Sequence, residues 1–496
     1  MTVSSNSDVQ VAIIGQGVMG HNLALNFSSH GYSVAVFDLD DSLAKATETA
    51  ALSQQLPGTV NVASDLAQLL SISQQPRRIV LSVPAGKAVD SICDSLLDSG
   101  LQPQDIVIDT GNCHWNDTLA RQQRYHSKFH FIASAISGGE VGARHGPSLM
   151  VSGDSNAWDQ IATMWQTIAA QVDADSGQPL PPHSKRSNRH ACADYVGPYG
   201  SGHFVKTIHN GIEYAQMQMW AEAYQLLRQH GQMDNFAIAA VFRDWQQGQL
   251  HSYLLECTIA VLEAMDGHSQ QPLLPLIVDA AGQKGTGTWT TIASLELGVA
   301  APSLASAVYA RAISSQRALR QALHGNLASP AQPAVELAQL ERFQSALEQT
   351  LIGTTLANYA QGFELMAAQA QQQQWPLDLV TIAKLWRAGC IIRTPLLQQF
   401  VNAFSANPKA HLFSDHTIQQ QLEATLPLWR RCLIDGIASG VALPVLSSGL
   451  AYVDGLRCAD SPANLLQGMR DYFGAHRFER HDASQGTLFH HPWHDS

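Results

Sequence analysis

The sequence predicts a doubly wound α/β domain, then a large all-helical domain and a short C-terminal tail. Strand-like runs alternate with helical stretches over about the first 190 residues, which is the pattern of a parallel sheet covered by helices. From Gly202 onward, the apolar residues recur at helical spacing instead. We therefore expect domains at 8–190 and 191–450, followed by a tail at 451–496.

The first strand-like run, residues 9–14, leads directly into a glycine-rich turn, and a helical run follows over residues 21–30. The turn has the sequence Gly15-Gln16-Gly17-Val18-Met19-Gly20. Glycines at this spacing allow a tight turn and let a pyrophosphate approach the free N–H groups at the helix start. The strand, turn and helix together predict a Rossmann dinucleotide-binding site.

The second strand-like run, residues 32–37, ends in Asp38, and no arginine follows it. A carboxylate at this position accepts hydrogen bonds from the adenosine ribose hydroxyls and repels a 2′-phosphate. These residues therefore predict NAD rather than NADP as the cofactor. The alternative interpretation is that Asp38 only stabilises a turn.

Three more strand-like runs, at 79–83, 106–109 and 129–135, end in polar or glycine-rich loops. Ligands of doubly wound sheets bind at the carboxyl ends of the strands. Asn112 and the loop Ser137-Gly138-Gly139 are therefore candidates for holding the substrate and the nicotinamide. The expected cofactor-binding residues are Gly15, Gln16, Gly17, Val18, Met19, Gly20, Asp38, Val83 and Asn112.

Residues 202–228 show the pattern of an amphipathic helix with an unusual polar stripe. A helical wheel places apolar residues on one side and, on the other, Lys206, His209, Asn210, Glu213 and Tyr214. A lysine whose pKa is lowered by burial serves as a base, and a nearby glutamate serves as the complementary acid. The stripe predicts a site that moves two protons, so another group must move electrons. The alternative is a solvated helix face.

Several basic residues lie outside this stripe. Residues 281–289 interleave glycine with Lys284 and Thr286, a composition that is unfavourable in a helix and suits a phosphate-binding loop. Residues 177–189 are basic and contain prolines, which predicts an exposed loop, with a contact site as the alternative. The aromatic segment 486–493 would expose its rings unless it docks, and we expect a partner subunit to receive it.

The composition excludes several classes of function. The chain has 496 residues, of which 45% are hydrophobic and 14% charged, and this balance is typical of a globular protein. A net charge of −12 without a basic tract argues against a nucleic-acid partner. No apolar run approaches the about 18 residues of a membrane helix. The seven cysteines form no C-x-x-C pair, which predicts a reducing cytoplasm, and the 21 histidines show no metal-ligand spacing, so no metal is expected.

These stretches resemble the decarboxylating 6-phosphogluconate dehydrogenase family. The resemblance extends from about Val9 to Trp493 and is carried by residues 15–22, 109–118, 137–150, 202–224, 281–289 and 470–476. It implies a Rossmann domain, a helical domain and a tail that reaches into the partner of a homodimer with shared active sites. It also implies that 6-phosphogluconate is oxidised with a nicotinamide cofactor and decarboxylated to ribulose 5-phosphate.

The resemblance further implies roles for individual residues. Lys206 corresponds to the general base, and Glu213 corresponds to the acid that protonates the enediol. Positions around the sugar acid and its phosphate correspond to Asn112, Ser137, Gly138, Gly139, His209, Asn210, Tyr214, Lys284, Thr286, Arg311, Arg470 and His476. The family supplies Arg470 and His476 from the other subunit.

The departures from the family concern the cofactor. Members that use NADP, the usual family cofactor, commonly carry Asn-Arg-Thr where this sequence has Asp38-Leu39-Asp40. They often carry Lys at the position of Pro84 and Ala at that of Gly17. These differences favour NAD. Residues 179–188 look like an insertion, to which the resemblance assigns no role.

Two other functions fit parts of the pattern. A β-hydroxyacid dehydrogenase of another substrate would share the first domain, but it would leave Lys284, Arg311 and Arg470 without an anion to pair with. A non-catalytic sensor of phosphogluconate or a nucleotide is supported only by the altered cofactor loop. An active dehydrogenase is therefore the leading hypothesis.

Overall fold

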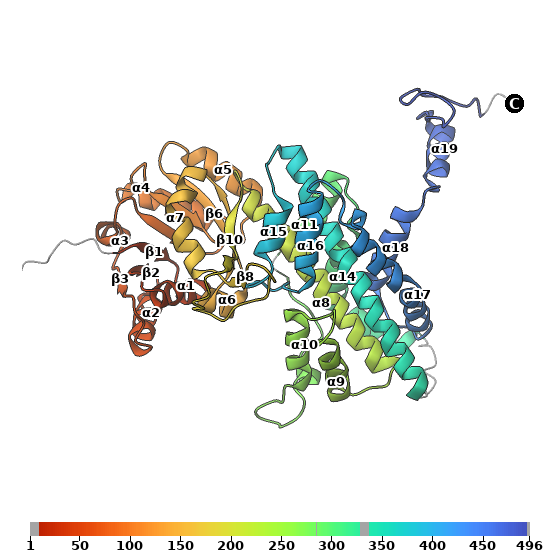
Figure 1. The fold of residues 1–496 in the computed structure, drawn as a ribbon, viewed down its shortest axis with the longest axis horizontal. Coiled ribbons are helices and arrows are strands. Elements are labelled where there is room, and N and C mark those ends of the chain that lie inside the picture. Colours follow the sequence, from red (N-terminus) through yellow and green to blue (C-terminus); the bar gives the residue numbers. More distant parts are fainter. Residues whose placement is uncertain (1–8, 284, 328–336, 494–496) are drawn as a thin grey trace, which may run out of the picture.

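The computed structural model describes residues 9–283, 285–327 and 337–493. An N-terminal sheet domain and a helical domain lie side by side, and helix α19 (Ala463–Gly474) stands away from both (Figure 1). This arrangement confirms the predicted order of an α/β domain, an all-helical domain and a tail.

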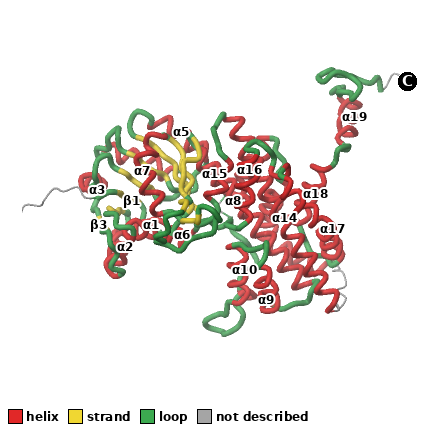
Figure 2. The backbone as a smooth tube through the Cα atoms, in the orientation of Figure 1, coloured by secondary structure: helices red, strands yellow, loops and turns green. Residues whose placement is uncertain are grey.

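The N-terminal domain is built on a sheet with the strand order β10-β7-β6-β5-β4-β1-β2-β3 (strands yellow in Figure 2). The neighbours from β3 to β6 are parallel, whereas β6 and β7 are antiparallel. The central strands are apolar and buried because helices cover both faces of the sheet. The strands are β1 (Val11–Ile14), β2 (Val34–Phe37), β3 (Val60–Val62), β4 (Arg78–Leu81), β5 (Ile106–Asp109), β6 (His130–Ser137), β7 (Ser148–Gly153) and β10 (Ala193–Gly197).

Helices pack on both faces of this sheet, as the doubly wound prediction requires. One face carries α1 (Val18–Ser29), α2 (Asp41–Ser53), α6 (Gly139–His145) and α7 (Ser155–Ile168). The other face carries α3 (Leu66–Ile72), α4 (Lys87–Asp98) and α5 (Trp115–Tyr125). The chain crosses from one face to the other where β1 lies between β2 and β4, and the crevice at the carboxyl ends of β1 and β4 is where such sheets bind ligands.

The second domain is helical and has its own large core. Its two longest helices pack against each other, and a Cβ at Gly362 would lie 2.5 Å from the Ile212 side chain, so glycine is needed for this approach. The helices are α8 (Ser201–Gln229), α9 (Asn235–Trp245), α10 (Tyr253–Glu263), α11 (Thr286–Leu297), α12 (Pro302–Ser315), α13 (Arg317–Asn326), α14 (Leu337–Gln373), α15 (Leu379–Leu385), α16 (Leu396–Ala406), α17 (His416–Ala438) and α18 (Pro444–Arg457).

The structure corrects several predicted bounds. The sheet continues through β10 to Gly197, so it extends past the expected boundary at 190. Helix α18 crosses the expected boundary at 450, and the protruding tail follows Arg457. Helix α1 begins at Val18 and therefore includes the last glycine of the turn. Strands β3, β7 and β10 were not predicted, because each is short or lacks a clear apolar alternation.

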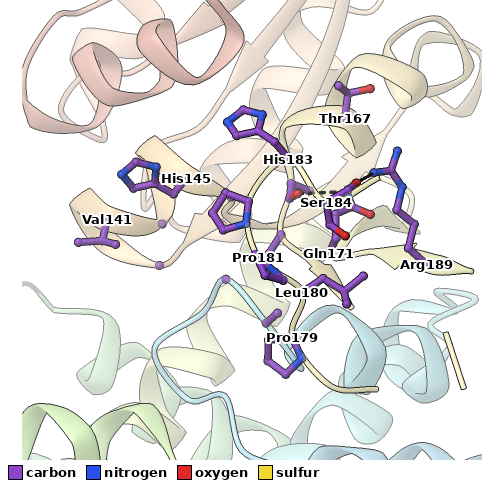
Figure 3. Close-up of a pocket in the computed structure, with 18 of the residues that line it drawn as sticks. Val141, His145, Thr167, Gln171, Pro179, Leu180, Pro181, His183, Ser184 and Arg189 are labelled. Carbon is purple, nitrogen blue, oxygen red and sulfur yellow. Dashed lines mark hydrogen bonds between the residues drawn. The ribbon is translucent and has the colours of Figure 1, made fainter. Parts of the chain in front are cut away.

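The loop between β8 (Gln171–Asp173) and β9 (Arg189–Ala191) contains the basic insertion. These two strands form a small antiparallel sheet of their own. This pairing holds the two ends of the loop next to each other. Residues 179–185 of the loop lie over the N-terminal domain near α6 (Figure 3). Most of these residues are exposed, as expected of a loop, and they also line a cavity.

The C-terminal segment folds back on α19 around the buried carboxylate of Asp471. This carboxylate accepts hydrogen bonds from the Arg477 backbone N–H at 2.9 Å, the His491 backbone N–H at 3.1 Å and the Trp493 indole N–H at 2.8 Å. These bonds and the nearby His490 ring hold the pKa of Asp471 well below its usual value, against the effect of burial. The aromatic end is thus partly covered by its own chain, although Phe473 remains exposed.

Candidate active site

The glycine-rich turn after β1 has the geometry of a dinucleotide cradle. Gly15 has a φ of +94°, and a Cβ there would lie 2.3 Å from the Ser82 carbonyl oxygen. A Cβ at Gly20 would lie 1.8 Å from the Gly15 carbonyl oxygen, so α1 can approach the turn only with glycine at this position. The space where a Cβ of Gly17 would point is open, which leaves room at the start of α1 for a pyrophosphate. Val83 borders the same turn.

Asp38 lies at the carboxyl end of β2 and is tied to this turn. Its Oδ2 accepts a hydrogen bond of 2.6 Å from the Gln16 backbone N–H, and its Oδ1 accepts one of 2.9 Å from the Asp40 backbone N–H. Asp38 therefore does more than stabilise a local turn, because it joins the end of β2 to the glycine-rich turn. Next to it, Leu39 is 97% exposed.

The polar stripe lies at the interface of the two domains, on the first half of α8. Helix α8 packs against β6, β7 and β10 on one side and against α11, α12 and α14 on the other. A Cβ at Gly202 would lie 2.6 Å from the Met150 carbonyl oxygen, so glycine lets the helix begin against β7. Lys206 is only 7% exposed, and His209 is fully buried. The alternative of a solvated helix face is therefore excluded.

Lys206, His209 and Ser137 form a connected polar group. Lys206 Nζ lies 3.3 Å from His209 Nδ1, and His209 Nε2 lies 2.9 Å from Ser137 Oγ. Asn210 Oδ1 lies 3.1 Å from His209 Nδ1. Burial and the positive charge of Lys206 lower the pKa of His209 well below its usual value, so the imidazole is neutral.

Glu213 lies one helical turn further along the same face, and its side chain is 22% exposed. Its Oε2 lies 3.8 Å from His209 Nδ1. Burial raises the pKa of Glu213, although Lys206 and Arg311 act in the opposite direction. Burial lowers the pKa of Lys206, although Glu213 opposes this. Burial thus moves the pKa of the amine down and the pKa of the carboxyl up on one helix face, which is the direction that a base and an acid require.

The glycine loop at the end of β6 faces a segment of the helical domain that the sequence analysis did not single out. Gly138 has a φ of +122°, and a Cβ there would lie 2.3 Å from the Gly389 carbonyl oxygen. The Trp386 ring packs against the His209 imidazole with their centroids 5.6 Å apart. A glycine a few residues after the end of a helix, within the sequence Trp386-Arg-Ala-Gly389-Cys390, was the available signal for this contact.

Tyr214 and Arg311 lie together beyond Glu213. The Arg311 guanidinium stacks over the Tyr214 ring at 3.5 Å, and its Nη1 donates a hydrogen bond of 3.0 Å to the Gly282 carbonyl oxygen. A Cβ at Gly287 would lie 2.5 Å from the Tyr214 ring, which places the start of α11 against the same residue. Thr286 is the first residue of α11 and is buried. Lys284 lies outside the described residues.

Four further candidates are arranged differently. Asn112 lies in the loop after β5 and is exposed, and Gly139 begins α6 beside Ser137. Arg470 and His476 are exposed on the protruding tail, away from α8 in the same chain (Figure 1). One chain therefore brings together the candidate residues of α8, α11, α12 and β6, whereas the two tail residues lie elsewhere.

Among the described residues, no cluster of His, Cys, Asp or Glu is placed to hold a metal ion, and no helix combines the length and apolarity that a membrane crossing requires.

Two family models match this chain. Residues 10–177 match the NAD binding domain of 6-phosphogluconate dehydrogenase, and residues 202–493 match the C-terminal domain of 6-phosphogluconate dehydrogenase. The stretch between them, 178–201, lies in neither match and contains most of the basic loop.

Similar proteins extend over nearly the whole chain. The decarboxylating 6-phosphogluconate dehydrogenase of Treponema pallidum is 40% identical over 97% of this chain and 96% of its own length. The corresponding human protein is 38% identical over 98% of this chain and 97% of its own length. A Plasmodium falciparum 6-phosphogluconate dehydrogenase, solved with NADP+ and with 6-phosphogluconate, superposes with a TM-score of 0.90 at 31% identity, over 98% of this chain and 100% of that one. On this evidence, the chain belongs to the 6-phosphogluconate dehydrogenase family.

Proposed function

We propose that this protein oxidises and decarboxylates 6-phosphogluconate to ribulose 5-phosphate and CO2. The observation that carries this function is the buried polar group on α8, where burial shifts the pKa values of Lys206 and Glu213 in opposite directions. An alcohol oxidation followed by a decarboxylation needs one group that accepts a proton and a second that donates one. The names of the relatives, which describe decarboxylating dehydrogenases, support the same reaction.

In this proposal, the neutral Lys206 amine accepts the proton of the substrate hydroxyl as the carbon-bound hydrogen leaves as hydride. The resulting ammonium then polarises the new ketone and returns its proton to that oxygen as CO2 leaves, which gives an enediol. Glu213, whose pKa is raised by burial, delivers a proton to the enediol carbon, and the Lys206 amine takes back the hydroxyl proton as the ketone forms. Ser137 and Asn210 contact His209, which lies between the base and the acid.

The nicotinamide cofactor supplies the acceptor for the hydride. The open space beside Gly17 and the tight packing of Gly15 and Gly20 fit a dinucleotide at the start of α1. The Arg311 guanidinium, which stacks over the Tyr214 ring, is suited to bind the phosphate of the substrate. A guanidinium provides two parallel hydrogen-bond donors.

We also propose that NAD is the preferred form of this cofactor. Asp38 is held in place by two backbone N–H groups, and Leu39 occupies the next position without a cation. Initial rates with each cofactor at saturating 6-phosphogluconate, compared as kcat/KM, test this preference. We expect NAD to win by about tenfold or more, which is about 1.4 kcal/mol. Higher kcat/KM with NADP would show that another cation reaches the 2′-phosphate, and the role of Asp38 would then be wrong.

The reaction itself is tested with a Lys206→Met variant, which keeps the length of the side chain and removes the amine. We expect kcat to fall by about 10³-fold, because a general base typically contributes on the order of 10²–10⁴. The KM for 6-phosphogluconate should change much less, because the phosphate contacts remain. Binding of 6-phosphogluconate without reduction of either cofactor by the unmodified protein would instead favour a sensor. Comparable turnover of unphosphorylated gluconate would favour a different hydroxyacid substrate.

We further propose that the active protein is a homodimer whose tails complete each other's sites. Arg470 lies on α19, which stands away from the rest of its own chain, and His476 follows the end of that helix. The helix exposes Leu465, Leu466, Met469 and Phe473. An apolar face of this kind on a protruding helix suits a surface that a second copy covers. The cations it carries would then reach the phosphate from the partner.

A further inference from the structure

The basic loop between β8 and β9 covers a cavity of about 430 Å³ at the boundary of the two domains (Figure 3). Its walls come from the start of the loop, from α6 and its following turn, and from the segment around Gly389 of the helical domain. The catalytic side chains on α8 do not line it. The volume lies in the range of small-molecule sites, which is about 300–1,000 Å³.

The cavity is lined by basic side chains from four parts of the chain. They are His30 at the end of α1, His145 in α6, His183, Lys185 and Arg189 in or beside the loop, and Arg393 of the helical domain. No aspartate or glutamate is among the described residues that line it. In a chain with a net charge of −12, the three cations Lys185, Arg189 and Arg393 therefore line one cavity without a carboxylate among its described lining residues.

The contacts within the cavity hold several of these groups in place. The His30 and His183 rings lie 4.5 Å apart, and Arg189 donates a hydrogen bond to the Ser184 carbonyl oxygen. The Arg393 guanidinium lies 3.6 Å from the centre of the Tyr253 ring. The β8–β9 pair anchors both ends of the loop, which fixes where the loop begins and ends beside the cavity.

The protonation of the imidazoles reflects the same surroundings. Burial lowers the pKa of His145, and the positive charges of Arg144 and His183 lower it further. Burial also lowers the pKa of His30, with His183, Arg144 and Arg189 acting in the same direction and a backbone hydrogen bond opposing them. An anion in the cavity would relieve this repulsion.

Apolar side chains also line the cavity, among the basic ones. They are Pro179, Leu180, Pro181 and Val141, which provide a surface for a carbon skeleton (Figure 3). A ligand that matches both kinds of lining has one or more phosphate groups on a small organic body. We propose that this cavity is a second binding site, separate from the catalytic one, for a phosphorylated organic molecule.

The test is isothermal titration calorimetry of the full-length protein with glucose 1,6-bisphosphate. Saturating 6-phosphogluconate, without cofactor, keeps the catalytic site filled. We expect one binding event per chain. Lys185→Gln should weaken it about tenfold by removing a cation from the cavity. Arg186→Gln is the matched control, because Arg186 lies in the same loop but pairs with Asp173 at 3.0 Å and does not line the cavity.

A second variant avoids any change to the loop. Thr167→Glu places a carboxylate on the α7 wall of the cavity and should abolish binding while leaving kcat/KM for 6-phosphogluconate unchanged. Absence of binding by the unmodified protein would overturn the proposal. So would equal weakening by Lys185→Gln and Arg186→Gln, or binding that survives Thr167→Glu. Inorganic pyrophosphate is titrated in parallel, and equal affinity for it would overturn the organic part of the assignment.

Discussion

His209 connects Lys206 to Ser137: its Nδ1 lies 3.3 Å from Lys206 Nζ, and its Nε2 lies 2.9 Å from Ser137 Oγ. One buried imidazole therefore joins α8 of the second domain to the glycine loop of the first. Because its pKa is well below the usual value, it stays neutral and orients the amine without competing for the proton.

This arrangement predicts the effect of removing the ring. His209→Ala leaves a buried amine and a buried hydroxyl without their partner, and we expect kcat to fall by about 10- to 100-fold. His209→Gln should recover part of the loss, because an amide offers both a donor and an acceptor. The KM for the nicotinamide cofactor serves as the control. A pH profile of kcat/KM that is identical in both variants and the unmodified protein would contradict the orienting role.

The buried carboxylate of Glu222 predicts how stability depends on pH. It accepts hydrogen bonds of 3.0 Å from the Val445 and Leu446 backbone N–H groups at the start of α18. Burial raises its pKa from 4.5 to about 7, so the folded protein holds a proton there that the unfolded chain releases. The contribution of this group is therefore fully present below pH 4.5 and is lost as pH rises to 7.

A Glu222→Gln variant removes this titration. Its midpoint of denaturant unfolding should depend less on pH between 4.5 and 7 than that of the unmodified protein. At 1.36 kcal/mol per pKa unit, the difference in the free energy of unfolding amounts to at most about 3 kcal/mol across that range. Parallel curves for the two proteins would contradict the raised pKa.

The glycines of the cofactor turn provide a matched pair of substitutions. Gly20→Ala forces a Cβ to within 1.8 Å of the Gly15 carbonyl oxygen, so we expect it to destabilise the domain by about 1–3 kcal/mol or to displace α1. Gly17→Ala meets open space at an ordinary negative φ and should leave the melting temperature nearly unchanged. Thermal unfolding without cofactor measures both, and equal losses would contradict the tight approach of α1 to the turn at Gly20.

The proposed exchange of tails predicts complementation between two inactive variants. Lys206→Met lacks the base, and Arg470→Gln lacks the tail cation. In a mixed dimer, one site combines an intact Lys206 with the partner's intact Arg470, so random mixing should restore about a quarter of the unmodified activity. Co-expression followed by a rate assay measures this, with each variant alone as the control. Activity no higher than that of the separate variants would place Arg470 within its own chain's site.

The local features of the site were predictable from the sequence, and the contacts between distant segments were not. The offsets along one helix placed Lys206, His209 and Glu213 on a single face, because helical periodicity is a local property. The hydrogen bond between Ser137 and His209 joins residues 72 positions apart, and no spacing rule anticipates it. The rule that ligands bind at the carboxyl ends of the strands pointed to Ser137 as a candidate, but not to its contact with His209.

The same limit explains the errors in the fold. Strands β7 and β10 complete the sheet only because the chain returns to its edge, and their own sequences carry little alternation. The loop 177–189 has the composition of a solvated segment, yet the pairing of β8 with β9 places part of it over a cavity. The composition of a segment indicates whether it can be exposed to solvent. Its neighbours in the fold depend on where the paired strands at its ends are held.

The carboxylate of Asp471 has a consequence for assembly. By gathering the backbone of Arg477 and His491 and the indole of Trp493, it gives the tail a defined shape within a single chain. A segment that folds only on contact incurs an ordering entropy at that moment, whereas one that is already folded does not. In the proposed dimer, the tail would therefore dock as a preformed segment, and the association rate should be limited by collision and orientation rather than by coupled folding.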